Sequence, residues 1–301
     1  MRIGLGIDSR LALSDTEQEA VAVEAAALGY TSLWTPAGPD PFGLCARWHA
    51  ASGLVTGISV LPIQSWSAER LIAETRTVAA RAGRRFVLGV GAGSVRERPI
   101  AALRDLAGAL RAGLPDAPLY LGALGPHMLR LAGERYDGAA LNWCSPEQTL
   151  WSRERVAAGA RAAGRDPGAV TIHQYIRVCV DPDVAAARAA LAKMALGYAM
   201  VRPGTDPTMG YRGHFTRMGF DDVLTDLEAR RARGVGDDEL AALLPDGLLA
   251  RVGFWGRPAD AAAGFEALGA GLDVAVVRVV AAKNNDVECV RLAMRSCVRA
   301  S

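Results

Sequence analysis

The sequence predicts a (β/α)8 TIM barrel, formed by a single domain over residues 1–301. Short apolar runs alternate with helical patterns at a spacing of roughly forty residues, which is typical of βα units around a parallel sheet. There are eight such runs, the number that closes a barrel of this kind. Active sites of such barrels lie where the strands end, so the residues that end each run are the first candidates for function.

The predicted strands cover residues 3–8, 32–36, 57–63, 86–91, 119–123, 138–143, 170–180 and 273–280. Helices lie between them, and the clearest spans residues 67–82 with Ser67 as its N-cap. Its apolar face carries Leu71, Ile72, Thr75, Val78 and Ala79. A last helix is predicted over 286–299, again with apolar residues at helical spacing.

Two regions depart from a plain barrel. After the fourth strand, residues 95–113 hold little more than one helix. Residues 201–251 form a long insertion with two helical patterns before the last strand. A segment of that length predicts a lid or a subunit contact, and a helix pair that only packs is the alternative.

Composition excludes several classes of protein. Half of the residues are apolar, but no run reaches the roughly eighteen needed to cross a bilayer. Met1 and Arg2 lead straight into the first strand, so we expect no signal peptide and a cytoplasmic protein. The 34 basic and 32 acidic residues are interleaved, which argues against nucleic-acid binding. The five cysteines lack metal-like spacing and are expected to be reduced thiols, with no metal site.

Residues 118–143 read as a buried strand, a turn at Gly125 and Pro126, a short helix and another buried strand. Gly125 lets the backbone approach a ligand closely, and Pro126 suits the first helical position. The amides that follow would form an anion site at the helix N-terminus. A strand-to-helix turn without a ligand is the alternative interpretation.

This segment resembles the luciferase-like flavin and deazaflavin oxidoreductases, whose fifth strand and helix carry a similar pattern. The matching residues are Tyr120, Leu121, Gly122, Ala123, Gly125, Pro126, Ala132, Gly133, Asp137 and Gly138. Residues 27–34, 85–94 and 252–260 resemble three further motifs of that family, in the same order along the chain. The resemblance therefore covers most of the sequence and implies a barrel oxidoreductase, commonly a homodimer.

The resemblance is closest to the branch that uses coenzyme F420. Many FMN monooxygenases of the family carry an arginine near the end of the fourth strand, where this chain has Ala92, Gly93 and Ser94. We therefore expect hydride transfer between the deazaflavin and a small organic substrate. An FMN-dependent monooxygenase or reductase is the alternative. A cofactor-binding protein without catalysis, and a barrel enzyme acting on phosphorylated metabolites without redox chemistry, also remain open.

The same resemblance assigns the cofactor site. The backbone after the third strand would hold the ring, often with a non-prolyl cis peptide, and the 123–127 turn would bind the phosphate. The glycine spacing G-x-G-x-G over 89–93 is not a dinucleotide motif, and small residues there would let a flat ring lie against the strand ends. The expected cofactor-binding residues are Ser59, Val60, Leu61, Gly91, Gly93, Ser94, Ala123, Leu124, Gly125, Pro126 and His127.

Many deazaflavin relatives carry a histidine after the second strand, and residues 34–40 have none. The expected catalytic residues are Asp8, His173 and Tyr175, which end or line strands at the barrel mouth. An inward Asp8 would suit acid–base work, with pairing to Arg177 as the alternative. For His173 the alternative is a hydrogen-bonded barrel residue. The predicted substrate pocket contains Trp34, Trp66, Trp143 and Arg177, an aromatic and weakly charged set that favours a neutral or modestly polar molecule.

Overall fold

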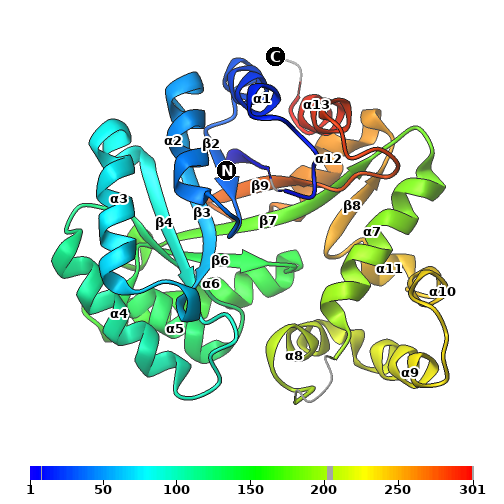
Figure 1. The fold of residues 1–301 in the computed structure, drawn as a ribbon. Coiled ribbons are helices and arrows are strands. Elements are labelled where there is room, and N and C mark those ends of the chain that lie inside the picture. Colours follow the sequence, from blue (N-terminus) through cyan, green and yellow to red (C-terminus); the bar gives the residue numbers. More distant parts are fainter. Residues whose placement is uncertain (8, 202–205, 300–301) are drawn as a thin grey trace.

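Nine parallel strands form the sheet in the computed structural model, which describes residues 1–7, 9–201 and 206–299. They are β1 (Arg2–Gly6), β2 (Ser32–Thr35), β3 (Val55–Pro62), β4 (Phe86–Gly91), β5 (Leu119–Gly122), β6 (Gly138–Asn142), β7 (Thr171–Val180), β8 (Gly253–Gly256) and β9 (Val274–Val279). Strands β1 to β7 pair in sequence, β7 pairs with β9, and β9 pairs with β1, which closes the barrel (Figure 1). The predicted barrel of eight strands is therefore confirmed.

The ninth strand, β8, was not predicted. It pairs with residues Arg177–Val180 of β7, while β6 pairs with Thr171–Tyr175 of the same strand. Because β9 occupies the other edge of β7, β6 and β8 share one edge in succession. The wall of the barrel thus continues through β8 beyond the end of β6.

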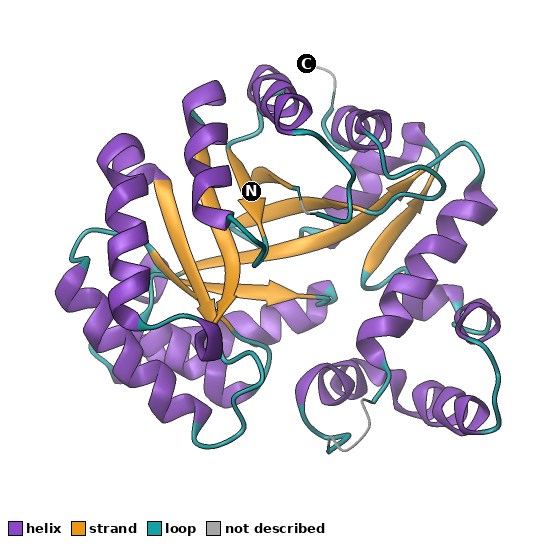
Figure 2. Ribbon diagram, in the orientation of Figure 1, coloured by secondary structure: helices purple, strands orange, loops and turns teal. Residues whose placement is uncertain are grey.

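Helices surround the barrel, as Figure 2 shows. Those of the βα units are α1 (Asp15–Ala27), α2 (Pro41–Ser52), α3 (Ala68–Ala82), α4 (Pro99–Gly113), α5 (Pro126–Arg135), α6 (Pro146–Ala162), α7 (Val184–Ala199), α12 (Pro258–Leu268) and α13 (Val287–Ser296). The predicted cap at Ser67 is present, because its side chain accepts from the Arg70 amide. Asp286, predicted as the first residue of the last helix, is instead the N-cap of α13 and accepts from the Cys289 amide. Short 3-10 helices are η1 (Ile63–Ser65), η2 (Gly83–Arg85) and η3 (Pro167–Ala169).

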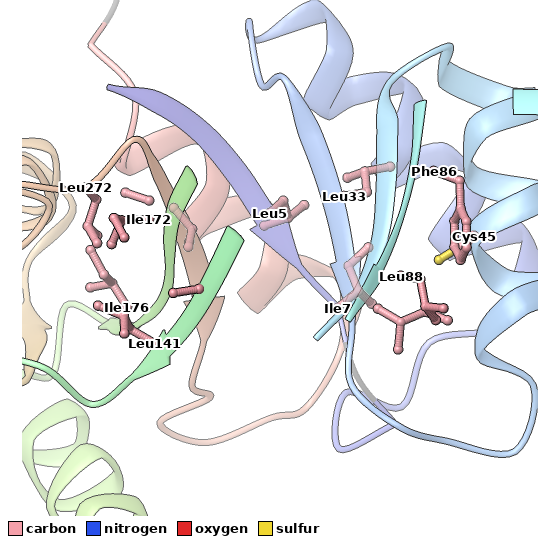
Figure 3. Packing of buried hydrophobic residues seen from close by; sticks show 14 of the residues in the cluster. Leu5, Ile7, Leu33, Cys45, Phe86, Leu88, Leu141, Ile172, Ile176 and Leu272 are labelled. Atoms are coloured by element: carbon pink, nitrogen blue, oxygen red, sulfur yellow. The ribbon is translucent and has the colours of Figure 1, made fainter. Parts of the chain in front are cut away.

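The main core lies between the strands and the outer helices. Outward side chains such as Leu5, Leu33 and Leu88 are wholly buried there (Figure 3). The barrel interior is filled differently, because aromatic rings pack against glycines. Built Cβ atoms on Gly57 and Gly138 would lie 2.4 Å from the Trp34 ring and 2.6 Å from the Tyr120 ring. Glycines therefore make the space that large rings occupy inside this barrel.

The predicted insertion is helical and holds α8 (Gly210–Phe215), the π-helix η4 (Thr216–Phe220), α9 (Asp221–Ala232), α10 (Asp237–Ala242) and α11 (Asp246–Leu249). These helices gather beside α7, at the lower right of Figure 1. They share a second core with the strand ends, where Trp143, Cys179 and Val280 are buried. Among the described helices, none is long and apolar enough to cross a membrane.

Candidate functional site

The C-terminal ends of β3, β4 and β5 lie side by side in the barrel wall. Strand β3 shifts register between Ile58 and Leu61, and the Ser59–Val60 peptide bond is cis, at the place that the family resemblance implies. The Val60 side chain faces Gly91 and Gly122, whose built Cβ atoms would lie 2.8 and 3.0 Å from its methyl groups. Gly91 thus makes room for the Val60 side chain. We had expected the glycine to make room directly for a flat ring.

The end of β4 is tied to η1 by one side chain. The Ser94 amide donates to Oε1 of Gln64 over 3.3 Å. Gly93 has a φ of +58°, and a built Cβ would lie 2.1 Å from the same Gln64 oxygen. Both the backbone angle and the close approach require glycine here. The predicted residues Gly93 and Ser94 therefore lie next to the β3 bulge at one strand end.

The first turn of α5 follows β5 as predicted. Gly125 is the N-cap, and no side chain of the described residues caps the helix. A Cβ on Gly125 would meet nothing within 4 Å, so the space beside it is open. The first-turn amides of a helix lack intrahelical acceptors. Arg217 of η4 donates to the Leu124 carbonyl over 3.1 Å, which places a cation from the insertion at this turn and was not predicted.

The inner face of β7 carries His173, Tyr175 and Arg177 in succession. His173 is wholly buried, and its ring lies 4.1 Å from the ring of Trp34. Neither ring nitrogen has a hydrogen-bond partner among the described residues. Burial lowers the pKa of His173 to about 3, so the ring is neutral. His173 lies deeper in the barrel than Arg177, and this geometry does not support its predicted role as proton donor at the mouth.

Two predicted pocket residues lie away from the mouth. Trp34 is buried in the barrel interior, where its Nε1 donates to Oγ of Ser32 over 2.8 Å. Trp66 packs on the outer helices, 5.4 Å from the Phe42 ring and with the Arg70 guanidinium 4.1 Å above it. Trp34 lies within β2 and Trp66 follows η1 after β3, and the two side chains do not meet in a shared pocket.

The other two predicted pocket residues do lie together. The Arg177 guanidinium lies 4.4 Å from the centre of the Trp143 ring. Trp143 is wholly buried with a φ of +57°, and it packs against Tyr198 of α7 and Phe215 of α8. The Trp143 ring therefore packs against the Arg177 guanidinium. Because Trp143 is wholly buried, it does not line an open surface.

Side chains from the insertion and from β9 complete this cluster. Asn142 accepts a hydrogen bond from Arg177 and donates to the Tyr211 hydroxyl over 2.5 Å. The Arg278 guanidinium lies 4.7 Å above the Tyr175 ring. Sequence reasoning weighed neither Arg278 nor Tyr198. The alternation of Val274, Val276 and Arg278 along β9 was the signal for Arg278, whereas Tyr198 gives none.

Asp8, a predicted catalytic residue, lies outside the described residues. Within the described ranges, no group of three or more His, Cys, Asp or Glu side chains could hold a metal ion. The five cysteines are free, and burial raises the pKa of the Cys144 thiol to about 12 although it lies 3.7 Å from Nε2 of His214. This Cys–His pair is therefore an uncharged packing contact.

Comparison with known proteins agrees with the architecture. The chain is 32% identical over 174 residues to 5,10-methylenetetrahydromethanopterin reductase of Methanolobus tindarius. That alignment covers 58% of this chain and 49% of the relative, so the chain spans about half the length of that protein.

Solved structures share the fold across nearly the whole chain. The coenzyme F420 dependent tetrahydromethanopterin reductase from Methanopyrus kandleri superposes with a TM-score of 0.76 and 17% identity, covering 98% of this chain and 97% of the other. An F420-dependent secondary alcohol dehydrogenase in complex with an F420-acetone adduct gives a TM-score of 0.73 and 15% identity, covering 99% and 98%. The model of the luciferase-like monooxygenase family matches residues 96–274, more than half of the sequence. The chain belongs to the luciferase-like monooxygenase family.

Proposed function

We propose that this protein is a coenzyme F420-dependent oxidoreductase that transfers a hydride between the deazaflavin and a small organic substrate. One observation carries the proposal: three neighbouring strand ends, of β3, β4 and β5, are built from backbone and glycine around Val60, and an uncapped helix N-terminus follows directly. A flat ring with a phosphate attached fits such a surface. The 32% identity to a methylenetetrahydromethanopterin reductase supports a reductase over a binding protein.

The residues at these strand ends suit the ring, the side chain and the phosphate of the cofactor. The backbone of Ser59, Val60 and Leu61 would face the ring, and Gly93 and Ser94 its side chain. The open first turn of α5, from Ala123 through Leu124, Gly125, Pro126 and His127, would bind the phosphate through amides. When bound, the deazaflavin supplies a carbon that accepts or gives a hydride.

The protein's own groups orient the substrate and exclude water. Insertion side chains contact the ends of β5 and β6, because Arg217 bonds the Leu124 carbonyl, Tyr211 bonds Asn142, and His214 bonds the Trp143 carbonyl over 3.0 Å. The insertion thus covers this side of the mouth. Tyr175, beside Arg278, is the described residue that we propose to exchange a proton with the substrate.

FMN is the second candidate, and one contact favours it. The end of β4 has no arginine, which was the reason to prefer the deazaflavin, but Arg217 brings a cation to the phosphate turn from the insertion. The same turn could therefore bind the FMN phosphate. The reaction would then be flavin-dependent oxygenation or reduction.

The test is a titration of the purified apo-protein with F420 and, separately, with FMN, followed by fluorescence quenching. Tight binding of F420 alone is the expected result. A preference for FMN would move the function to the second candidate. Binding of neither would reject the redox assignment, while turnover with a bound cofactor would reject a non-catalytic binding protein.

We also propose a homodimer, on the resemblance to relatives that pair through outer helices. Light scattering should give twice the chain mass of 31.6 kDa. A mass of one chain would contradict the pairing without bearing on the cofactor. Residence in the cytoplasm stays a prediction.

A further inference from the structure

Arg177 is a buried cation without a counter-ion in the described part of the chain. Its side chain is 2% exposed, and no carboxylate of a described residue lies within ion-pair distance of it. Arg212 in the insertion is buried to a similar degree, 6% exposed, yet it pairs with Glu228 at 2.8 Å and Asp221 at 2.9 Å. Among the described residues, Arg212 thus has two carboxylate partners and Arg177 has none.

The hydrogen bonds of Arg177 leave one edge of the guanidinium unused. Nη1 donates to the Asn142 amide oxygen and, over 3.3 Å, to the Tyr175 carbonyl. Nε and Nη2 make no hydrogen bond with a described residue, and Nε is buried. These two nitrogens form the side-on edge of arginine, which matches the two oxygens of a carboxylate.

The surroundings hold the charge in place without neutralising it. Aromatic rings of Trp143, Tyr198 and Tyr175 have centres 4.4, 5.4 and 5.9 Å from the guanidinium carbon. Such contacts stabilise a cation but carry no net negative charge. Burial lowers the pKa of Arg177 to about 10, so the group stays protonated at neutral pH. A buried charge of this kind costs stability when it is unpaired.

Among the described side chains, those that are charged at neutral pH and act on Arg177 are positive. Arg10 and Arg278 both act on it electrostatically. Burial raises the pKa of Tyr198, but the charge of Arg177, a hydrogen bond from Arg10 and the charges of Arg10 and Arg278 together outweigh this effect and bring that pKa below its ordinary value. A negative group placed here is therefore favoured. This differs from the weakly charged mouth that the sequence predicts.

We propose that Arg177 and Asn142, with the rings of Trp143 and Tyr198, form a subsite for a carboxylate of the substrate. The proposal rests on the proposed function and narrows its substrate class to organic acids. Arg177 binds the carboxylate through its Nε and Nη2 edge. A planar monoanion fits because the side-on edge of one guanidinium matches its two oxygens and the supporting rings are aromatic.

The experiment uses trifluoroacetate as the probe and follows its 19F line width and shift on titration of the apo-protein. Trifluoroacetamide is the neutral counterpart and should bind at least tenfold more weakly. Arg177→Gln should weaken trifluoroacetate binding at least tenfold, and Arg177→Lys, which keeps the charge but loses the side-on edge, should fall between. Arg155→Gln is the matched control, because Arg155 also stacks on a tryptophan, 4.2 Å from the ring of Trp151, but on an outer helix.

The outcomes separate the subsite from the cofactor assignment. Arg177→Gln should leave the melting temperature of the apo-protein equal or higher, since it removes a buried charge that no described carboxylate pairs with. A large drop in melting temperature together with unchanged probe binding would make Arg177 a structural residue and overturn the proposal. Trifluoroacetate should still bind when the protein is saturated with F420. Competition between the two would assign the subsite to the cofactor's own anionic groups and overturn the substrate class. If the protein binds no F420 but binds the probe through Arg177, the subsite stands while the proposed function fails.

Discussion

Val60 occupies the space that a side chain at Gly91 would need, because a Cβ built on Gly91 would lie 2.8 Å from Cγ2 of Val60. The contact joins β3 to β4 at the level where the Ser59–Val60 peptide turns the chain. The residue type that fits at position 60 therefore depends on the residue at position 91, and the reverse holds as well. A pair of this kind can be tested by a double-mutant cycle.

Gly91→Ala should destabilise the protein by about 1–3 kcal/mol, because the added methyl group overpacks against Val60. Val60→Ala removes the conflicting methyl groups. The double variant should therefore lose less stability than the sum of the losses in the two single variants. Urea denaturation of the four proteins gives the coupling energy. Additive effects would mean that Val60 does not fill this space in solution.

Gly125→Asp should separate helix capping from ligand binding. An aspartate at the N-cap satisfies first-turn amides, so the free energy of unfolding should rise by about 0.5–1 kcal/mol. The same carboxylate would occupy the proposed phosphate site, and F420 affinity should fall at least tenfold. Gly125→Asn caps the helix without charge and is the matched control, with a smaller loss of affinity. Equal affinity in all three proteins would place the phosphate elsewhere.

Acid should destabilise the protein partly through His173. Its pKa is about 3 when folded and about 6.5 in the unfolded chain, so below pH 6.5 the unfolded state binds the proton first. The free energy of unfolding should therefore fall as pH drops from 6.5 toward 3, by up to about 1.4 kcal/mol per pH unit, and be unaffected by this group above 6.5. His214, with a pKa of about 4, adds to the same trend.

His173→Gln should reduce this slope by about one proton in denaturation curves measured from pH 7 to pH 5. If His173→Gln leaves the slope unchanged, burial does not hold this ring neutral.

Arg212→Met should loosen the insertion while the barrel stays folded. The substitution leaves Glu228 and Asp221 without the guanidinium that joins them, at a cost of about 1–3 kcal/mol. Hydrogen exchange should speed up in α8 and α9 and stay unchanged in β1 to β5. Arg230→Met, which removes an exposed pair with Asp226, is the control and should have little effect. Uniform faster exchange over the whole chain would mean that the insertion is not an independent unit of stability.

The barrel strands could be predicted because each is a local apolar run bounded by turns. Strand β8 could not, since Gly253–Gly256 holds two glycines and only four residues, and it is a strand because β7 offers a free edge. The cap at Ser67 is local and was predicted correctly. The direction in which a side chain turns after a strand is not local, which is why Trp66 was placed in the wrong surroundings.

The candidate site likewise has parts that the sequence could predict and parts that it could not. The 123–127 turn and the β3 bulge are continuous in sequence, so a motif could indicate them. The Arg177 cluster joins β6, β7, α7 and α8, and Tyr211 lies 69 residues from the Asn142 that it contacts. Only the folded chain brings these groups together and shows that Arg177 is buried with no carboxylate partner among the described residues.

Strands β6 and β8 share one edge of β7, and this arrangement determines where the chain can accept changes in length and sequence. Strand β6 ends opposite Tyr175 and β8 begins opposite Arg177, so α7 and β8 fix both ends of the insertion to the barrel wall. Residues between these anchors can be lengthened, shortened or exchanged while every ladder bond of the closed barrel is kept. On the proposed function, grafting this segment from one barrel of the family to another, with α7 and β8 as the splice points, would test whether it carries substrate specificity.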